Sequence, residues 1–248
     1  MVARGIHADR ENKGITMKSL KLSLLAAAGA LAFAGAAHAD DGGRPLGLVF
    51  NAGGATDYIF RGVSQTQNQP EVFAGADVTL GKIGYAGTWW SNIDFGDSAD
   101  TEYDLYFGVK PTLGPVALDF GAIRYGYIKD HNDWTYWEAK AAASLPLGPA
   151  TVGAAFYYSP NATGPGNINA YYYELNGSIP IPNSKFSASA AVGRQDYQGP
   201  GDYTTWNLGM GYAVNDHIGL DFRYYDTDAH DFGKLYKARF VASLKTTF

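Results

Sequence analysis

The sequence predicts an all-β protein: a transmembrane up-and-down antiparallel β-barrel of about twelve strands, preceded by a cleaved signal peptide. Three observations predict this fold. The final segment alternates apolar and polar residues and ends on an aromatic residue, similar alternation recurs along the whole chain, and the connections between these segments alternate between short and long.

The first residues are predicted to be a targeting signal that does not belong to the folded domain. Basic residues precede a small, apolar run over residues 22–37, and small residues surround a cleavage site after Ala39. We therefore assign residues 1–39 to an extension plus a secretory signal peptide, with the start at Met17, and residues 40–248 to one outer-membrane barrel domain. A transmembrane helix is the alternative, but the run is short and rich in Ala and Gly.

The composition narrows the class of protein. Without residues 1–39, the 19 basic and 24 acidic residues of the chain fall to 14 and 22, a net charge of −8, which argues against nucleic acid as a partner. The chain has no cysteine, so no disulfide stabilises it. Aromatic residues make up 15%, yet mean hydropathy is slightly negative. Strands that alternate between lipid and water give this combination.

Each strand is predicted from alternation with a period of two. The twelve segments lie near residues 47–62, 70–80, 83–94, 101–111, 115–128, 134–146, 150–159, 168–180, 185–197, 202–213, 217–226 and 235–248. An even number places both chain ends on the same side of the membrane, as bacterial barrels require.

The connections between these segments fall into two classes that interleave. One class is tight and rich in Gly, Pro and Asn, and the other is longer and more polar. The turns lie near residues 81–82, 112–115, 146–149, 181–184 and 214–216, and the loops near 64–69, 95–100, 129–133, 159–167, 198–201 and 227–233. We expect the turns on the periplasmic side and the loops outside.

The last segment shows the clearest alternation. Phe240, Ala242 and Leu244 share one face with Phe248, while charged residues occupy the other face. A terminal strand that ends in Phe resembles the signal by which the barrel assembly machinery recognises its substrates. We therefore expect Phe248 to be the assembly signal and outer-membrane lipid to surround the apolar face.

Three motifs carry a resemblance to a known family. Residues 56–66 read TDYIFRGVSQT, residues 85–89 read YAGTW and residues 91–96 read SNIDFG. The chain resembles the TorF family of porin-like proteins over about residues 47–248. The resemblance implies an outer-membrane barrel and a channel, but no particular solute.

The inner wall is the expected functional site. The phase of each strand turns many charged residues inward, where they must be paired or hydrated. The predicted pore-lining residues are Asp57, Arg61, Asp94, Glu102, Asp104, Glu138, Lys140, Glu174, Asp221, Arg223, Lys237 and Arg239. We expect the acidic and basic residues to occupy separate sectors, which favours a hydrated pore over a lumen closed by ion pairs.

Closure of the barrel brings the first and last strands together. Asp57 should then lie close to Lys237 or Arg239. None of the three histidines after residue 39, His131, His217 and His230, is placed as a strand-borne base beside a nucleophile, so we expect no catalytic residue, and no metal or cofactor.

The sequence thus favours a channel in the bacterial cell outer membrane for passive diffusion of small hydrophilic solutes or ions. The alternative is a closed outer-membrane barrel with a structural or surface-interaction role.

Overall fold

A computed structural model describes residues 46–131, 134–160 and 168–248. The predicted signal peptide over residues 1–39 and most of the predicted loop at residues 159–167 lie outside these ranges. No helix of the described ranges is long and apolar enough to cross a membrane.

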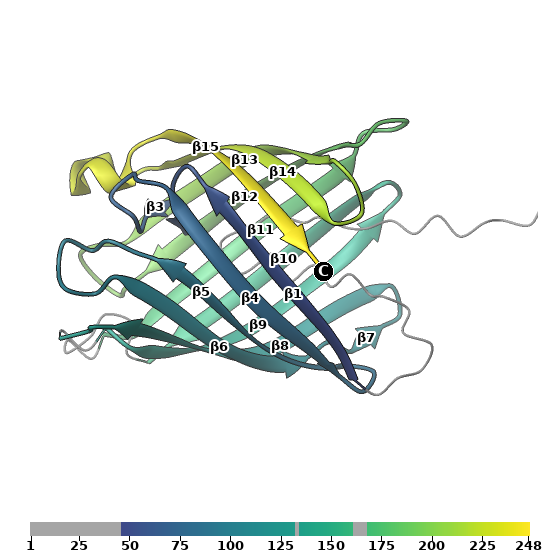
Figure 1. Ribbon diagram of the computed structural model, residues 1–248, viewed down its shortest axis with the longest axis horizontal. Coiled ribbons are helices and arrows are strands. Elements are labelled where there is room, and N and C mark those ends of the chain that lie inside the picture. Colours follow the sequence, from purple (N-terminus) through teal and green to yellow (C-terminus); the bar gives the residue numbers. More distant parts are fainter. Residues whose placement is uncertain (1–45, 132–133, 161–167) are drawn as a thin grey trace, which may run out of the picture.

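The fold is a closed antiparallel barrel of 12 long strands (Figure 1). The strands are β1 (Leu46–Ala55), β4 (Glu71–Leu80), β5 (Gly84–Asn92), β6 (Thr101–Val109), β8 (Val116–Ile128), β9 (Tyr136–Leu147), β10 (Ala150–Ser159), β11 (Ala170–Pro180), β12 (Phe186–Asp196), β13 (Tyr203–Ala213), β14 (Ile218–Thr227) and β15 (Arg239–Thr247). Each pairs with its neighbours in chain order, and a short β7 (Thr112–Leu113) extends the turn before β8. The prediction of an up-and-down barrel of about twelve strands is confirmed.

The barrel closes where β1 pairs with β15, with Asn51 opposite Thr247 and Ala55 opposite Ser243. The chain terminus takes part, because the backbones of Phe50 and Phe248 exchange hydrogen bonds of 2.8 and 2.9 Å. Closure gives each of the 12 long strands a hydrogen-bonded neighbour on both sides, which is the condition for placing a sheet in lipid.

The two faces of the barrel differ in polarity, as the alternation predicts. Leu105 and Phe107 on β6, Phe222 on β14 and Phe240 on β15 are all exposed on the outer face. On the same strands, residues such as Asp104 turn inward and are buried. An apolar outer band around a polar interior is typical of barrels that sit in a membrane.

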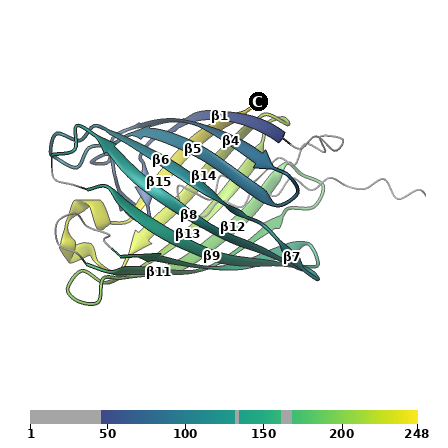
Figure 2. The same ribbon diagram turned by 90° about the horizontal axis from the view of Figure 1, so that it is seen from below.

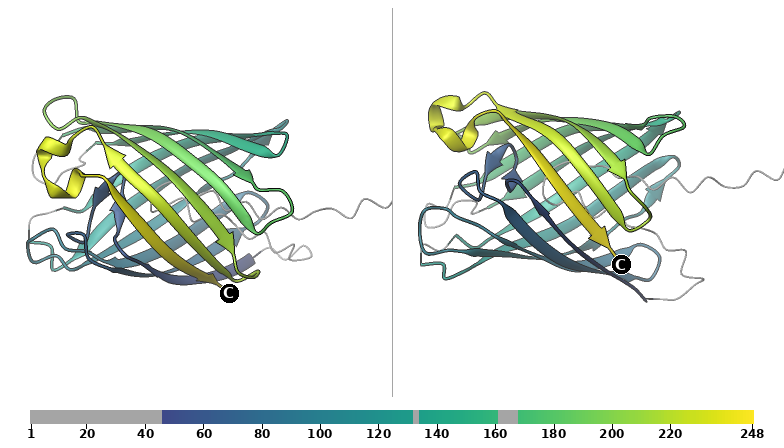
Figure 3. Two further views of the ribbon diagram at one scale, coloured as in Figure 1. Left: turned by 90° about the horizontal axis from the view of Figure 1, so that it is seen from above. Right: turned by 45° about the horizontal axis from the view of Figure 1, so that its top comes forward.

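The connections that the structure describes also follow the predicted order. The tight turns lie at the end of the barrel that holds Phe248, which we call the turn end. The longer connections lie at the opposite loop end, where two 3-10 turns, η2 (His230–Phe232) and η3 (Lys234–Tyr236), precede β15 (Figures 2 and 3).

Two predicted strand boundaries are wrong. The first strand ends at Ala55 and not near residue 62, because residues 56–70 fold into the barrel and form a small hairpin of β2 (Ile59–Phe60) and β3 (Val63–Ser64). We call residues 56–70 the inward hairpin. The last strand begins at Arg239 and not at residue 235, because η3 occupies the preceding residues.

Candidate functional site

The base of the inward hairpin is fixed by Asp57, which is buried. Its Oδ1 accepts hydrogen bonds from the hydroxyls of Ser64 at 2.6 Å and Thr66 at 2.9 Å. Its Oδ2 forms a salt bridge of 2.9 Å with Nη1 of Arg239 on β15. The prediction that closure brings Asp57 to Lys237 or Arg239 is therefore confirmed for Arg239. This ion pair ties the hairpin to the strand that closes the barrel.

The tip of the hairpin crosses the lumen to the opposite wall. Nη2 of Arg61 lies 2.6 Å from Oε1 of Glu138 on β9, and Nη1 donates to Oε1 of Gln195 on β12 at 3.0 Å. The guanidinium also lies over the rings of Tyr172 and Tyr157, 4.3 and 5.0 Å from their centroids. Burial lowers the pKa of Arg61, but Glu138 together with Tyr125 and Tyr136 raises it, and the net result is a pKa well above its ordinary value. Arg61 therefore stays charged and holds the tip in place.

Gly62 lets the tip approach the remaining wall. Its φ of +84° is a left-handed conformation that favours glycine. A Cβ at this position would lie 2.1 Å from Oγ1 of Thr205 on β13 and 2.9 Å from Cγ2 of Thr227 on β14. Only glycine fits this contact.

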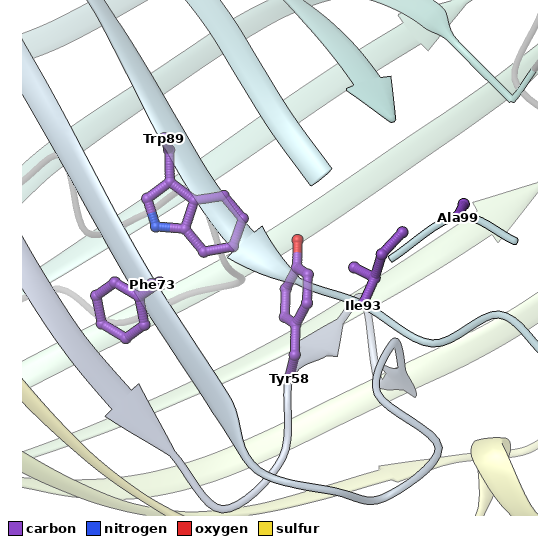
Figure 4. Packing of buried hydrophobic residues seen from close by; sticks show 5 residues of the cluster. All are labelled: Tyr58, Phe73, Trp89, Ile93 and Ala99. Carbon is purple, nitrogen blue, oxygen red and sulfur yellow. The ribbon is translucent and has the colours of Figure 1, made fainter. Parts of the chain in front are cut away.

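The side of the hairpin packs on β4 and β5. Tyr58 stands edge-on to Trp89, with ring centroids 5.3 Å apart, in a small core that includes Phe73, Ile93 and Ala99 (Figure 4). The Tyr58 hydroxyl donates to the Glu102 carboxylate at 2.6 Å. Burial, followed by nearby carboxylates, raises the pKa of Tyr58 well above its ordinary value, so the hydroxyl remains a donor. The hairpin is thus anchored at its base, side and tip.

Four carboxylates lie beside the hairpin on the wall of the lumen: Glu71, Glu102, Asp104 and Glu138, and all are buried. Arg61 pairs with Glu138, and no described basic side chain forms a salt bridge with the other three. Neither carboxylate oxygen of Asp104 has a hydrogen-bond partner in the part of the chain that the structure describes. This sector of the lumen therefore holds more carboxyl groups than basic side chains.

Nearer the turn end, the lumen is polar and leaves room for water. Lys140 on β9 pairs with Asp119 on β8 at 2.7 Å, and each side chain keeps 19% of its surface exposed although both face inward. The hydroxyl of Tyr85 donates to the same aspartate at 2.7 Å. Exposed surface on charged side chains inside a closed barrel indicates that side chains do not fill the lumen at this level.

Arg223 on β14 organises the other side of the lumen. It forms a bidentate ion pair with Asp221, with contacts of 2.9 and 3.1 Å. It also donates to Asn207 on β13 at 2.6 Å and to Ser189 on β12 at 2.8 Å. The arginine is buried and uses most of its donors.

The predicted pore-lining residues fall into two groups. Most belong to the inward hairpin or face the lumen: Asp57, Arg61, Glu102, Asp104, Glu138, Lys140, Glu174, Asp221, Arg223 and Arg239. Asp94 lies in the exposed loop after β5, and Lys237 is exposed between η3 and β15. A role in solute passage stays a prediction for all of them.

The predicted separation of acidic and basic sectors is wrong at Arg61. The hairpin carries the guanidinium of Arg61 across the lumen to the carboxylate of Glu138, so a basic and an acidic residue meet instead of occupying separate sectors. Sequence reasoning also missed Gln195 and Asn207, which are neutral and so gave no charge signal, although the phase of β12 and β13 turns both inward.

With this geometry established, comparison with known proteins gives a family. A family described as "Bacterial protein of unknown function (Gcw_chp)" matches residues 39–248. The chain belongs to the Gcw_chp family. No curated protein is significantly similar to this Gcw_chp chain in sequence.

Solved porin structures share the fold of this Gcw_chp protein. A KdgM porin superposes with a TM-score of 0.58 at 5% identity, covering 81% of this chain and 99% of its own. A KdgM porin in complex with disordered oligogalacturonate gives a TM-score of 0.56 at 5% identity, covering 81% and 98%. A NanC porin gives 0.53 at 12% identity, covering 82% and 99%. At such low identity, the likeness concerns the fold alone.

Proposed function

We propose that this Gcw_chp protein is a porin-like channel in the bacterial outer membrane for passive diffusion of small hydrophilic solutes and ions. The observation that carries the proposal is the contrast between the two faces of the closed barrel. The outer face is apolar, whereas Asp119 and Lys140 inside the barrel remain partly hydrated. Such a barrel offers water-soluble molecules a route across lipid.

The inward hairpin forms the constriction of this channel. It spans the lumen from Arg239 on the closing strand to Glu138 on the opposite wall, so solutes pass beside it. The predicted lining residues at the loop end, including Asp94 and Lys237 at the mouth, tune which ions enter, while Arg223 and its partner Asp221 act nearer the turn end. This arrangement is the basis for selectivity by size and charge.

The surroundings of the barrel follow from the same proposal. Outer-membrane lipid contacts the apolar outer face, and the barrel assembly machinery binds the C-terminal strand through Phe248. The resemblance of residues 56–66 to the TorF family supports this assignment. A channel function also leaves no need for catalytic residues, and none is proposed.

The class of solute is small, hydrophilic and not strongly anionic. A KdgM porin has been seen with oligogalacturonate, so a barrel of this architecture can take an oligosaccharide. In the present chain, acidic residues outnumber basic ones on the lumen wall beside the hairpin, which disfavours polyanions.

Liposome swelling tests the proposal. Liposomes that contain the folded protein should swell when exposed to arabinose or glucose, and more slowly with a trisaccharide such as raffinose. Liposomes with heat-denatured protein serve as the control. Equal, background-level swelling for all sugars would contradict a passive channel.

A second function is supported by the paired charges of the lumen. The hairpin and its ion pairs with Glu138 and Arg239 could serve to close the barrel, in a structural or surface-interaction role. In that case the folded protein would give no swelling, and release of the hairpin would be required for any solute to pass.

A further inference from the structure

A cavity of about 330 Å³ opens at the loop end beside the inward hairpin. Phe60 and Val63 of the hairpin contribute one side, Tyr125 and Tyr136 line it from β8 and β9, and Tyr236 closes it from η3. This volume lies at the lower end of the range for small-molecule sites. We call this cavity the vestibule.

Aromatic rings dominate the vestibule. Of its 14 lining residues, 9 are Phe, Tyr or Trp, and they come from the hairpin, the wall and four separate loops. Among them, Tyr203 and Tyr236 meet edge to face with centroids 5.4 Å apart. Rings that converge from distant parts of a chain can surround a ligand with their electron-rich faces.

The residues that line the vestibule carry charge of one sign. Arg61 lies behind Phe60, with its guanidinium 4.7 Å from the ring centroid, and is paired with Glu138. Glu102 is the one carboxylate among the lining residues of the vestibule, and the lining includes no Lys, Arg or His. Two residues deeper on the same face of β6 lies Asp104, which is fully buried and has no hydrogen-bond partner among the described residues. An unpaired buried carboxylate is costly, so the group takes up a proton unless a cation nearby offsets that cost.

We propose that the vestibule binds a small organic cation, an alkylammonium group held by the aromatic faces and by Glu102. Ammonium cations bind to aromatic faces electrostatically, and a carboxylate strengthens the attraction. An anion would be repelled by the carboxylates, and a neutral sugar would gain nothing from the charge. This inference rests on the proposed channel, since it names the solute class recognised at its mouth.

The test is calorimetric titration of the folded protein in detergent with choline. Its neutral isostere 3,3-dimethyl-1-butanol and glucose are titrated in parallel. We expect choline to bind at least about tenfold more tightly than the isostere, because the two differ in charge and not in shape. Equal binding of choline and the isostere, or binding of glucose alone, would overturn the proposal.

Two variants and a control locate the site. Glu102→Gln removes the carboxylate but keeps a side-chain oxygen that can accept the hydrogen bond from the Tyr58 hydroxyl. This variant should weaken choline binding about tenfold. Tyr236→Leu removes a ring from η3, outside the strands of the barrel, and should also weaken binding. Asp216→Asn removes one charge from an exposed turn at the far end and should leave binding unchanged. Unaltered binding in Glu102→Gln would refute the site even if Tyr236→Leu failed to fold.

The choline titration and the liposome swelling test can fail independently of each other. Titration in detergent needs no membrane, whereas swelling needs an open lumen. If the native protein does not bind choline but its liposomes swell, only the cation site is refuted. If it binds choline but its liposomes do not swell, only the channel is refuted.

Discussion

Arg61→Met should release the inward hairpin from the wall of the lumen. The arginine is buried, pairs with Glu138 at 2.6 Å, donates to Gln195 at 3.0 Å and lies over the ring of Tyr172. Methionine fills similar space but lacks the charge. Glu138 would then keep the 3.1 Å hydrogen bond from the Tyr125 hydroxyl and lose its counter-ion.

The magnitude follows from the environment of the pair. Removing one partner of a buried ion pair costs about 3–5 kcal/mol. Because each 1.4 kcal/mol is about a tenfold change, the equilibrium between docked and released hairpin should shift by about a hundredfold to a few thousandfold. The barrel itself should persist, since the backbone pairing of β1 with β15 does not involve Arg61.

Two measurements on reconstituted protein check this effect. Single-channel conductance should rise and become noisier, and amide hydrogens of residues 56–70 should exchange faster, while the folded barrel still runs faster than the boiled protein on a gel. Arg194→Met is the matched control, because that side chain is 46% exposed and its contact with Asp202 spans 3.5 Å, so its loss should cost under about 1 kcal/mol. Unchanged conductance and exchange in Arg61→Met would refute the anchoring role of Arg61. Adding Glu138→Met should restore much of the docking, because no orphan charge remains.

Three further predictions concern the tip, the lumen wall and the chain end. Gly62→Val should undock the hairpin, since the new Cβ would strike Thr205 and the φ of +84° is strained for valine; faster amide exchange at residues 56–70 checks it. Arg223→Gln leaves Asp221 without its counter-charge and should shift the reversal potential in a salt gradient toward cation preference, less so at high salt. Deleting Phe248 removes its backbone pairing with β1 and should lower the amount of heat-modifiable barrel recovered from membranes.

The wall of the barrel could be predicted from the sequence because it depends on local patterns. A strand between lipid and water must alternate, and residues 101–109, 218–227 and 239–247 do so closely enough to give both position and phase. Tight turns rich in Gly and Pro supplied the order of the connections. Both patterns extend over only a few residues, so they can be recognised without knowing how the rest of the chain folds.

The inward hairpin could not be predicted in the same way. Residues 56–62 continue an apolar and polar pattern that suits a strand in the wall as well as a hairpin in the lumen. The contact between Arg61 and Glu138 joins residues 77 apart in sequence and depends on which strands face each other across the barrel. One local signal was present in the sequence: a glycine, Gly62, follows Arg61. In the structure both residues have positive φ, as a two-residue type I′ turn requires.

The side-chain contacts inside the lumen could not be predicted from the sequence either. The phase of β14 correctly turned Asp221 and Arg223 inward, but it did not reveal that they pair with each other and with neutral groups on β12 and β13. Alternation gives the face on which a side chain lies, whereas its partners depend on register and on the curvature of the closed sheet.

The most direct measurement of the central claim is the single-channel current of the folded protein in a planar lipid bilayer. A lumen that stays hydrated beside the inward hairpin predicts discrete, long-lived conductance steps, and larger steps for Arg61→Met. Folded, heat-modifiable protein that inserts without any current, in both the native sequence and the Arg61→Met variant, would contradict a channel function.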